Sequence, residues 1–430
     1  MRFLFTTFEG GGHVPPAIRV ALRLKDAGHA VLFVSDEANR AQVEPAGLPF
    51  TPWRTAPNRH ALGAPDDPLN EWRFRWPPAV VRAVCRSVIS GPAGAYADDT
   101  RELVRDFRPH VIVSNELLFG VILAGEREGV PVALLTANVW CFPTREDVPP
   151  FGPGFPPATG RFQEGRERTS RGLIRAWYDA GLEDLNAARR RHGLAPVSRL
   201  LDQLDAANLI LLGTSRAFDY DRADPPAPFV YAGLLAEAPR WVGTDDVDGL
   251  VDPARPNVLV SFSTTYQAQD DLAARCIRAL STLPVNGIVT LGPALDRERL
   301  PRADNVRVVT SASHDALLPR CALMICHAGH GTAARALTYG VPLVCLPTGR
   351  DQPENAARIA WAGAGLRLRP GASDKQIRKA VTTVLSNTAY REAARALGHR
   401  MLQNSDGGRG AAEALVSLAQ ANDLACAPGR

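Results

Sequence analysis

The feature that most limits how this chain can fold is a repeated alternation of short apolar runs with amphipathic segments. Residues 2–8 are typical of a buried strand that ends at a run of glycines, and residues 30–34 form a second apolar run. Between them, Pro15 and Pro16 suit the first turn of a helix, and Gly28 ends the segment. Two strands joined by so short a helical segment require a right-handed crossover, and therefore a parallel sheet.

The same alternation recurs along both halves of the chain. Apolar runs of strand length predict strands at 111–113, 130–135, 209–212, 258–262, 288–291, 306–309, 323–326 and 343–346. Longer amphipathic runs predict helices at 117–128, 171–192, 270–283 and 353–361. The tail at 374–424 is predicted to be mostly helical.

An acidic, proline-rich stretch at 218–252 separates the two sets and is predicted to be a linker. We therefore predict a first domain over 1–217, a second domain over 253–385, and C-terminal helices over 386–430 that pack back on the first domain. The predicted fold class is α/β, with two doubly wound, Rossmann-like domains that face each other across a cleft. Ligands of such folds bind at the carboxyl ends of the strands, so the cleft is the expected site.

Composition excludes several classes of function. The 430 residues carry 49 basic and 45 acidic side chains, a net charge of +4 with the signs interleaved, which predicts no nucleic-acid partner. No apolar stretch approaches the ~20 residues that cross a bilayer, and the first apolar run breaks too early for a signal peptide. Seven cysteines form no Cys-x-x-Cys pair, which indicates buried thiols. We expect a cytoplasmic protein without a transmembrane segment.

A glycine-rich turn with a histidine follows the first predicted strand. Residues 9–13 read Glu-Gly-Gly-Gly-His, which fits neither the dinucleotide fingerprint nor a phosphate-binding P-loop. His13 would lie at the ligand edge of the sheet, where an imidazole can accept a proton near neutral pH. A helix cap or a core imidazole is the structural alternative, and position alone does not decide between them.

The second half contains a richer motif at two neighbouring strand ends. His327, Gly329, Gly331 and Thr332 follow the strand at 323–326 and open a helix, whose free N–H groups form a site for a diphosphate. After the next strand, Asp351 and Gln352 place a carboxylate beside a carboxamide, a pair that suits vicinal hydroxyls. Each residue alone could be a simple cap, but their occurrence together favours a ligand site.

Residues 327–355 resemble the nucleotide-sugar signature of GT-B glycosyltransferases of family GT1, in the bacterial branch that glycosylates natural products. The segments at 12–16, 28–31, 260–264 and 313–319 are similar to other parts of that family, so the resemblance covers nearly the whole chain. It implies an inverting enzyme of the hexosyltransferase class, which needs no metal and no cofactor and uses a nucleoside diphosphate sugar as co-substrate.

The resemblance also implies a part for each matching position. In it, the first domain binds the acceptor, the second binds the nucleotide sugar, and His13 deprotonates the acceptor. The remaining positions bind the sugar nucleotide: His327, Gly329, Gly331 and Thr332 the diphosphate, Asp351 and Gln352 the sugar hydroxyls, and Ser313, His314 and Arg335 the nucleobase and ribose. Ser263 and Thr264 belong to a loop on the side of the sugar nucleotide.

Two positions depart from the family pattern. Where the family has an aspartate that orients the histidine, this chain has Asn115 followed by Glu116. An asparagine cannot stabilise an imidazolium by charge, so either Glu116 substitutes, the acceptor is already acidic, or activity is weak. Arg335 stands where the family often has a glutamate that binds ribose hydroxyls. Its presence favours dTDP, which lacks the 2′-hydroxyl, over UDP.

Aromatic residues near the predicted loops suggest an acceptor site. The candidates are Gly12, Trp72, Phe74, Trp76, Trp140 and Phe142. For Trp72, Phe74 and Trp76, the alternatives are a patch that rests on a membrane surface and the anchoring of a long loop to the first domain. Two Asp-x-Asp sequences, at 219–221 and 246–248, lie in the predicted linker, where acidic residues are usually solvated, so we predict no metal site.

The expected partners are a nucleotide sugar, a small hydrophobic acceptor and, in a homodimer, a second copy of the chain. Two alternatives to transfer remain open: a sugar-nucleotide-binding partner protein with little catalysis, which Asn115 would permit, and an epimerase acting on the sugar nucleotide itself.

Overall fold

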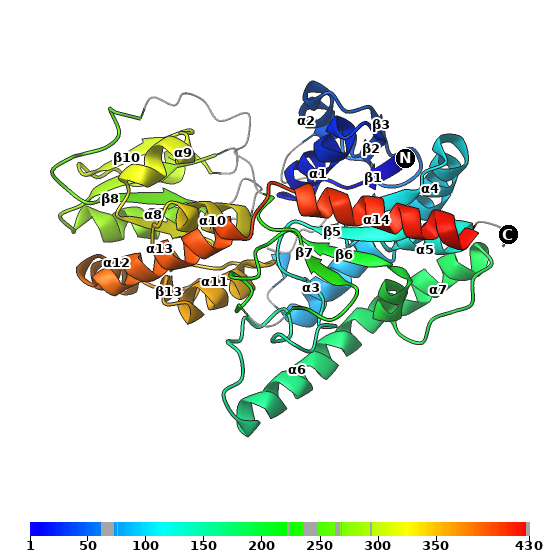
Figure 1. Cartoon of the computed structure of the whole chain (residues 1–430). Coiled ribbons are helices and arrows are strands. Elements are labelled where there is room, and N and C mark those ends of the chain that lie inside the picture. Colours follow the sequence, from blue (N-terminus) through cyan, green and yellow to red (C-terminus); the bar gives the residue numbers. More distant parts are fainter. Residues whose placement is uncertain are drawn as a thin grey trace.

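The structure is a computed structural model that describes residues 1–61, 73–74, 76–221, 224–235, 247–262, 267, 269–292 and 295–426. It consists of two α/β domains, each built on one parallel sheet (Figure 1). This confirms the predicted pair of doubly wound domains. Within the described helices, none is both long enough and apolar enough to span a membrane.

The first sheet has seven parallel strands in the order β3-β2-β1-β4-β5-β6-β7. Its strands are β1 (Arg2–Thr6), β2 (Ala30–Ser35), β3 (Phe50–Pro52), β4 (Val111–Ser114), β5 (Val132–Thr136), β6 (Leu209–Leu212) and β7 (Phe229–Tyr231). The central strands β4 and β5 are buried along their whole length, as parallel strands covered on both faces are.

The helices of this domain are α1 (Val14–Asp26), α2 (Arg40–Val43), α3 (Pro77–Val84), α4 (Ala93–Phe107), α5 (Phe119–Glu128), α6 (Arg161–Tyr178) and α7 (Leu182–Arg191). Two prolines occupy the first turn of α1, where a missing N–H costs nothing, and Leu24 on its buried face packs in one cluster with Phe3 and Phe5 of β1. A single π-helical turn, Cys85–Ile89, continues α3.

The second sheet has six parallel strands in the order β10-β9-β8-β11-β12-β13. Its strands are β8 (Asn257–Ser261), β9 (Asn286–Thr290), β10 (Val306–Val309), β11 (Leu323–Cys326), β12 (Leu343–Cys345) and β13 (Gly365–Arg367). The helices that follow are α8 (Asp270–Ser281), α9 (His314–Leu317), α10 (His330–Thr338), α11 (Gln352–Trp361), α12 (Asp374–Ser386), α13 (Thr388–Gln403) and α14 (Arg409–Cys426).

The last two helices belong to different domains. Helix α13 stays with the second domain, where Leu397 packs in one cluster with Leu337 of α10. Helix α14 instead lies across the first domain, where its Leu415 shares a cluster with Leu24 of α1 (Figure 1). The chain therefore crosses between the domains twice.

Three short or interrupted elements differ from the sequence expectation. The segment 218–252, expected as a linker, supplies β7, in which Val230 lies opposite Leu211 of β6. Strand β7 is only three residues long and closely follows prolines, and β3 is equally short and ends in a proline. Neither strand therefore has a clear apolar run in the sequence. The helix expected at 171–192 is two helices, α6 and α7, separated by a turn at Asp179–Gly181, because glycine is a weak helix former.

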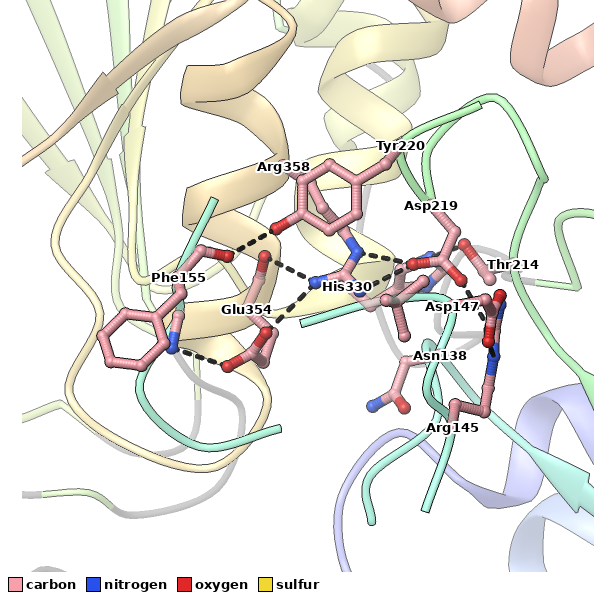
Figure 2. Close-up of polar contacts among 12 residues, drawn as sticks. Asn138, Arg145, Asp147, Phe155, Thr214, Asp219, Tyr220, His330, Glu354 and Arg358 are labelled. Atoms are coloured by element: carbon pink, nitrogen blue, oxygen red, sulfur yellow. Dashed lines mark hydrogen bonds and ion pairs between the residues drawn. The ribbon is translucent and has the colours of Figure 1, made fainter. Parts of the chain in front are cut away.

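A buried ion network joins the two domains (Figure 2). Asp219 is fully buried and accepts hydrogen bonds from Arg145 Nη1 at 2.7 Å and from the Tyr231 hydroxyl at 2.8 Å. Arg358 of α11 reaches the same carboxylate from the second domain, with Nη2 at 2.6 Å and Nε at 2.8 Å. Glu354, one turn earlier, lies 3.2 Å from Arg358 and accepts from two backbone N–H groups of the loop after β5.

The network corrects, for Asp219, the expectation that the acidic residues of 218–252 are solvated, whereas Asp221 and Asp224 are exposed as expected. Burial alone would raise the pKa of Asp219, but the positive charges of Arg358 and Arg145 outweigh it and hold that pKa below its usual value. Asp248 forms an exposed ion pair with Arg320, and Asp246 lies outside the described residues. No group of three or more His, Cys, Asp or Glu side chains within the described ranges is arranged to hold a metal ion.

The same interface brings the carboxyl ends of the two sheets together. His330, at the start of α10, has its Nε2 2.8 Å from the hydroxyl of Thr214, which follows β6. Arg350, which follows β12, donates to the carbonyl of Gly10, which follows β1, at 3.2 Å. Side chains from both sheet edges therefore meet at one place.

Candidate functional site

The turn after β1 presents His13 at the interface. A side chain at Gly10 would lie 2.6 Å from the ring of Phe8, so only glycine fits there. The Phe8 ring stacks on His13 with centroids 5.6 Å apart. His13 occupies the N-cap position of α1 but makes no capping hydrogen bond with its side chain. This arrangement removes the capping alternative and leaves the imidazole available for other contacts.

Asn115 and Glu116 follow β4, the strand that pairs with β1 so that Ser114 lies opposite Thr6. Both side chains are buried, and the amide nitrogen of Asn115 lies 3.0 Å from Nδ1 of His13 and 2.8 Å from Oε2 of Glu116. The three predicted catalytic residues are thus in direct contact, with Asn115 in the middle.

The electrostatics of this group follow from burial. Burial, together with the positive charge of Arg350, lowers the pKa of His13 to about 4, so the ring is neutral at pH 7. Burial raises the pKa of Glu116 to about 7, and the charge of the nearby Asp351 carboxylate acts in the same direction. Glu9, at the start of the same turn as His13, also has its pKa raised to about 7 by burial.

The turn at 327–332, between β11 and the first residues of α10, is built around His327 and is called the donor turn here because its residues are predicted to bind the sugar donor. The ring of His327 lies over Gly329, where an added Cβ would be 2.4 Å from Nε2, so this position requires glycine. The backbone between them takes a left-handed conformation at Ala328, and α10 begins directly afterwards. Gly331 is exposed and Thr332 half-buried in the first turn, whose N–H groups have no partner within the helix. The predicted diphosphate residues are therefore assembled at one helix N-terminus.

His327 itself is buried, and among the residues that the structure describes its Nδ1 has no hydrogen-bond partner. Burial lowers its pKa to about 4, and the charge of Arg350 acts in the same direction. A neutral imidazole can donate one hydrogen bond but brings no charge to an anion.

Arg350 is a site residue that the sequence did not single out. Its charge lowers the pKa of both His13 and His327, so the guanidinium lies within electrostatic reach of the two histidines from opposite domains. It is half-buried, and its backbone has a φ of 55°. The only sequence signal was an arginine immediately before the Asp-Gln pair, and arginines are common on surfaces.

The Asp-Gln pair holds its own loop in this structure. Asp351 accepts from the N–H of His330 at 3.3 Å and from the amide of Asn355 at 2.6 Å, which ties α11 to the donor turn. Gln352 is almost fully buried, and its Oε1 accepts from the backbone N–H groups of Thr348 at 2.7 Å and Gly349 at 3.2 Å. Asp351 lies at the site, whereas Gln352 has its amide oxygen held by its own loop and its amide nitrogen 2.9 Å from Oε1 of Gln267.

The predicted nucleobase residues form a second cluster on the same sheet. Ser313 caps α9 by accepting from the N–H of Ala316, and Nε2 of His314 lies 3.4 Å from the Thr290 hydroxyl. Arg335 lies 3.7 Å from Asp315 and, after burial, is the second cause of the lowered pKa of His314. Ser263 and Thr264 lie outside the described residues.

The predicted acceptor residues separate into two groups. Trp140 and Phe142 are 4% and 2% exposed and pack in the core of the first domain, which corrects the expectation that they face an acceptor. Phe74 and Trp76 are exposed, and they line an apolar pocket of about 550 Å³ with one face of α3. Gly12 is exposed in the His13 turn, and Trp72 lies outside the described residues.

The chain is similar to known proteins in both sequence and structure. Residues 278–408 match the family described as Erythromycin biosynthesis protein CIII-like, C-terminal domain. Over 401 residues the chain is 32% identical to 4'-demethylrebeccamycin synthase of Lentzea aerocolonigenes, which covers 91% of this chain and 93% of that protein. The solved structure of the kitacinnamycin glycotransferase has a TM-score of 0.74 at 19% identity, covering 97% of this chain and 98% of that one. The glycosyltransferase VinC in complex with dTDP has a TM-score of 0.66 at 20% identity, with 98% and 100% covered.

Proposed function

The chain belongs to the GT1 family of GT-B glycosyltransferases of natural-product biosynthesis, and we propose that it transfers a sugar from a dTDP-sugar to a hydroxyl of a hydrophobic aglycone with inversion at the anomeric carbon. The contact that carries the proposal is the hydrogen bond from Arg350 to the carbonyl of Gly10, three residues before His13. It sets the histidine of the first domain opposite the donor turn of the second.

In the proposed reaction, His13 is the general base. The acceptor hydroxyl gives its proton to His13 while its oxygen forms a bond to the anomeric carbon. The bond from that carbon to the diphosphate breaks on the opposite face, and its electron pair leaves with the diphosphate. Such an in-line displacement needs the base and the leaving-group site on opposite sides of the anomeric carbon, which two facing domains can provide.

Three kinds of hydrogen-bond donor are available to the departing diphosphate. In the first turn of α10, the N–H groups of Gly331 and Thr332 and the hydroxyl of Thr332 supply hydrogen bonds, and neutral His327 supplies one more. Because His327 is neutral, we assign the positive charge that balances the leaving group to Arg350, whose field already reaches both histidines.

We propose dTDP as the nucleotide because Arg335 stands near the ribose position in place of a carboxylate. VinC, of the same fold, was solved with dTDP, which supports this choice. Changing Arg335 to Glu should raise the affinity for UDP relative to dTDP, measured by calorimetry. Arg335→Met is the matched control, since it also removes the ion pair with Asp315 but adds no strong acceptor for the 2′-hydroxyl. An unchanged UDP-to-dTDP ratio in Arg335→Glu would contradict the assignment.

The proposed acceptor is a flat hydrophobic molecule. The pocket beside Phe74, Trp76 and α3, at about 550 Å³, has the size of a small-molecule site, and its lining is largely apolar. The exposed Trp76 offers an aromatic surface for stacking.

A turnover assay tests the proposed function. The protein is incubated with a panel of dTDP-hexoses and UDP-hexoses and with 2-naphthol, alizarin or quercetin as planar aromatic alcohols, and released nucleotide and glycoside are measured by mass spectrometry. We expect glycoside and free dTDP in equal amounts, and only when an alcohol is present. Donor consumption without an alcohol, yielding an isomeric sugar nucleotide, would support the epimerase instead. Binding of dTDP without any turnover would support a binding partner.

A further inference from the structure

The side chain of Asn115 has every hydrogen-bonding group engaged. Its Oδ1 accepts from the N–H of Leu117 at 2.9 Å. Its Nδ2 lies 2.8 Å from Oε2 of Glu116 and 3.0 Å from Nδ1 of His13, so each of its two hydrogens has an acceptor. Because the oxygen accepts from the Leu117 N–H in this structure, the nitrogen is the atom that faces His13.

This orientation decides where the proton of His13 lies. An amide N–H can only donate to Nδ1, so Nδ1 must be the unprotonated nitrogen of the neutral ring. The proton of the ring is then on Nε2, the nitrogen left for an acceptor molecule. In this state His13 presents an N–H group and cannot accept the proton of a hydroxyl.

We propose that Glu116 selects the tautomer of His13 through the amide of Asn115. With Glu116 ionised, the amide nitrogen serves both neighbours and His13 is a hydrogen-bond donor toward the acceptor. With Glu116 protonated, the amide turns over, and Oδ1 accepts from the Glu116 O–H and from Nδ1–H of His13. Nε2 is then the free base.

This inference rests on the proposed function and deepens it. Asn115 and Glu116 act as positioning residues, and His13 remains the group that touches the acceptor. During transfer, the hydroxyl proton moves to Nε2 of His13, and the imidazolium releases it to solvent after the products leave. The proton on Glu116 is neither consumed nor produced.

The surroundings of Glu116 keep both of its forms accessible. It is 1% exposed, and its Oε1 faces the thiol of Cys141, whose sulfur lies 3.6 Å away in the segment after β5. Asp351 at the start of α11 faces it across the interface, and His13 at the start of α1 faces it through Asn115. Burial, with a smaller contribution from Asp351 in the same direction, raises the pKa of this carboxyl to about 7, so its two forms exchange near neutral pH.

The turned amide gives up three hydrogen bonds, one from the Leu117 N–H and two from Nδ2 to Glu116 and His13, and gains two at Oδ1, from the Glu116 O–H and from Nδ1–H of His13. Its Nδ2 then faces the Leu117 N–H, a cost that the proton on Glu116 has to offset. Without the proton on Glu116, the turned amide would place its oxygen against a carboxylate oxygen, which repels it. Turning is therefore coupled to protonation.

The tautomer can be observed directly by ¹⁵N NMR of the histidine-labelled protein, because a protonated and an unprotonated ring nitrogen have well-separated shifts. The signals of His13 are identified by their loss in His13→Gln. We expect the proton on Nε2 at about pH 8.5 and on Nδ1 at about pH 6, with one midpoint between them. A single tautomer over this whole range would overturn the proposal.

Two variants separate the parts. Glu116→Gln removes the titrating group and should abolish the midpoint, whereas Glu183→Gln, an exposed side chain of the same type, should leave it in place. Asn115→Asp accepts from Nδ1 directly and should hold the proton there at every pH. A midpoint that survives in Glu116→Gln would also overturn the proposal.

The kinetic signature is a rate that falls as pH rises. About 3% of Glu116 remains protonated 1.5 pH units above its pKa, so Asn115→Asp should be about thirtyfold faster than the wild-type protein there. Equal rates would count against the inference. If the protein transfers sugar and His13→Gln abolishes it, but NMR shows a fixed tautomer, the proposed function stands and this inference fails. If no transfer occurs, the NMR titration still decides the tautomer.

Discussion

Replacing Arg358 with methionine should destabilise the protein by about 3 kcal/mol, because it removes one side of a buried ion network. Among the described residues, the change leaves fully buried Asp219 with Arg145 and Tyr231 as its remaining side-chain partners, and it removes the cation that pairs with Glu354. Removing one partner of a buried pair typically costs about 3 to 5 kcal/mol, and the remaining bonds to Asp219 place the cost at the lower end. Methionine keeps most of the side-chain volume, so the cost reports on charge rather than on packing.

The assay is urea unfolding followed by circular dichroism. Arg190→Met is the control, since its ion pair with Glu183 is exposed and should cost about 1 kcal/mol or less. Adding Asp219→Asn to Arg358→Met should cost less than the sum of the two single changes, because the second removes the charge that the first left unpaired. An Arg358→Met protein as stable as the Arg190→Met control, or single effects that add fully, would refute this reasoning.

Four further results are expected. His327→Ala should raise the dissociation constant for dTDP about tenfold by calorimetry, since it removes one hydrogen bond to an anion, and an unchanged constant would place the diphosphate elsewhere. Arg350→Gln should lower kcat about a hundredfold in the turnover assay, whereas Arg190→Gln should not; equal rates would remove Arg350 from the reaction. Glu116→Gln should be more stable than the wild-type protein by up to about 3 kcal/mol at about pH 8 and by much less at about pH 5. The reason is that burial raises the Glu116 pKa from 4.5 to about 7, so the stability of the protonated carboxyl is present below the unfolded pKa and is lost as pH rises through about 7; equal gains at both pH values would contradict it. Addition of EDTA should leave the transfer rate unchanged, and a large loss would show that a metal takes part.

The sequence predicted the core of both sheets well because parallel strands are buried on both faces. The strands β6, β10 and β11 have the predicted bounds, since each is a run of apolar residues between polar ends. The three-residue strands β3, β7 and β13 could not be found in this way. Each lies at the edge of its sheet, and it is extended because it pairs with the neighbouring strand, which the sequence does not reveal.

The site was predicted where a motif lies along the chain, and missed where contacts cross between domains. Asn115 and His327 stand directly after strands and His13 ends the turn that follows β1, so their common location follows from the sheet topology. Arg350 and Asp219 owe their roles to partners more than a hundred residues away. The orientation of the Asn115 amide depends on three neighbours at once, and no pattern in the sequence specifies it.

The central claim is that His13 removes the acceptor proton while the diphosphate leaves toward the second domain. The most direct test compares wild-type protein with His13→Gln, using a dTDP-hexose and the aromatic alcohol that gives the most glycoside, and determines the anomeric configuration of the product by NMR. The account predicts an inverted product, a loss of kcat of at least about a hundredfold in His13→Gln, and an unchanged dissociation constant for dTDP. A product that retains the configuration of the donor, or a His13→Gln protein with full activity, would contradict it.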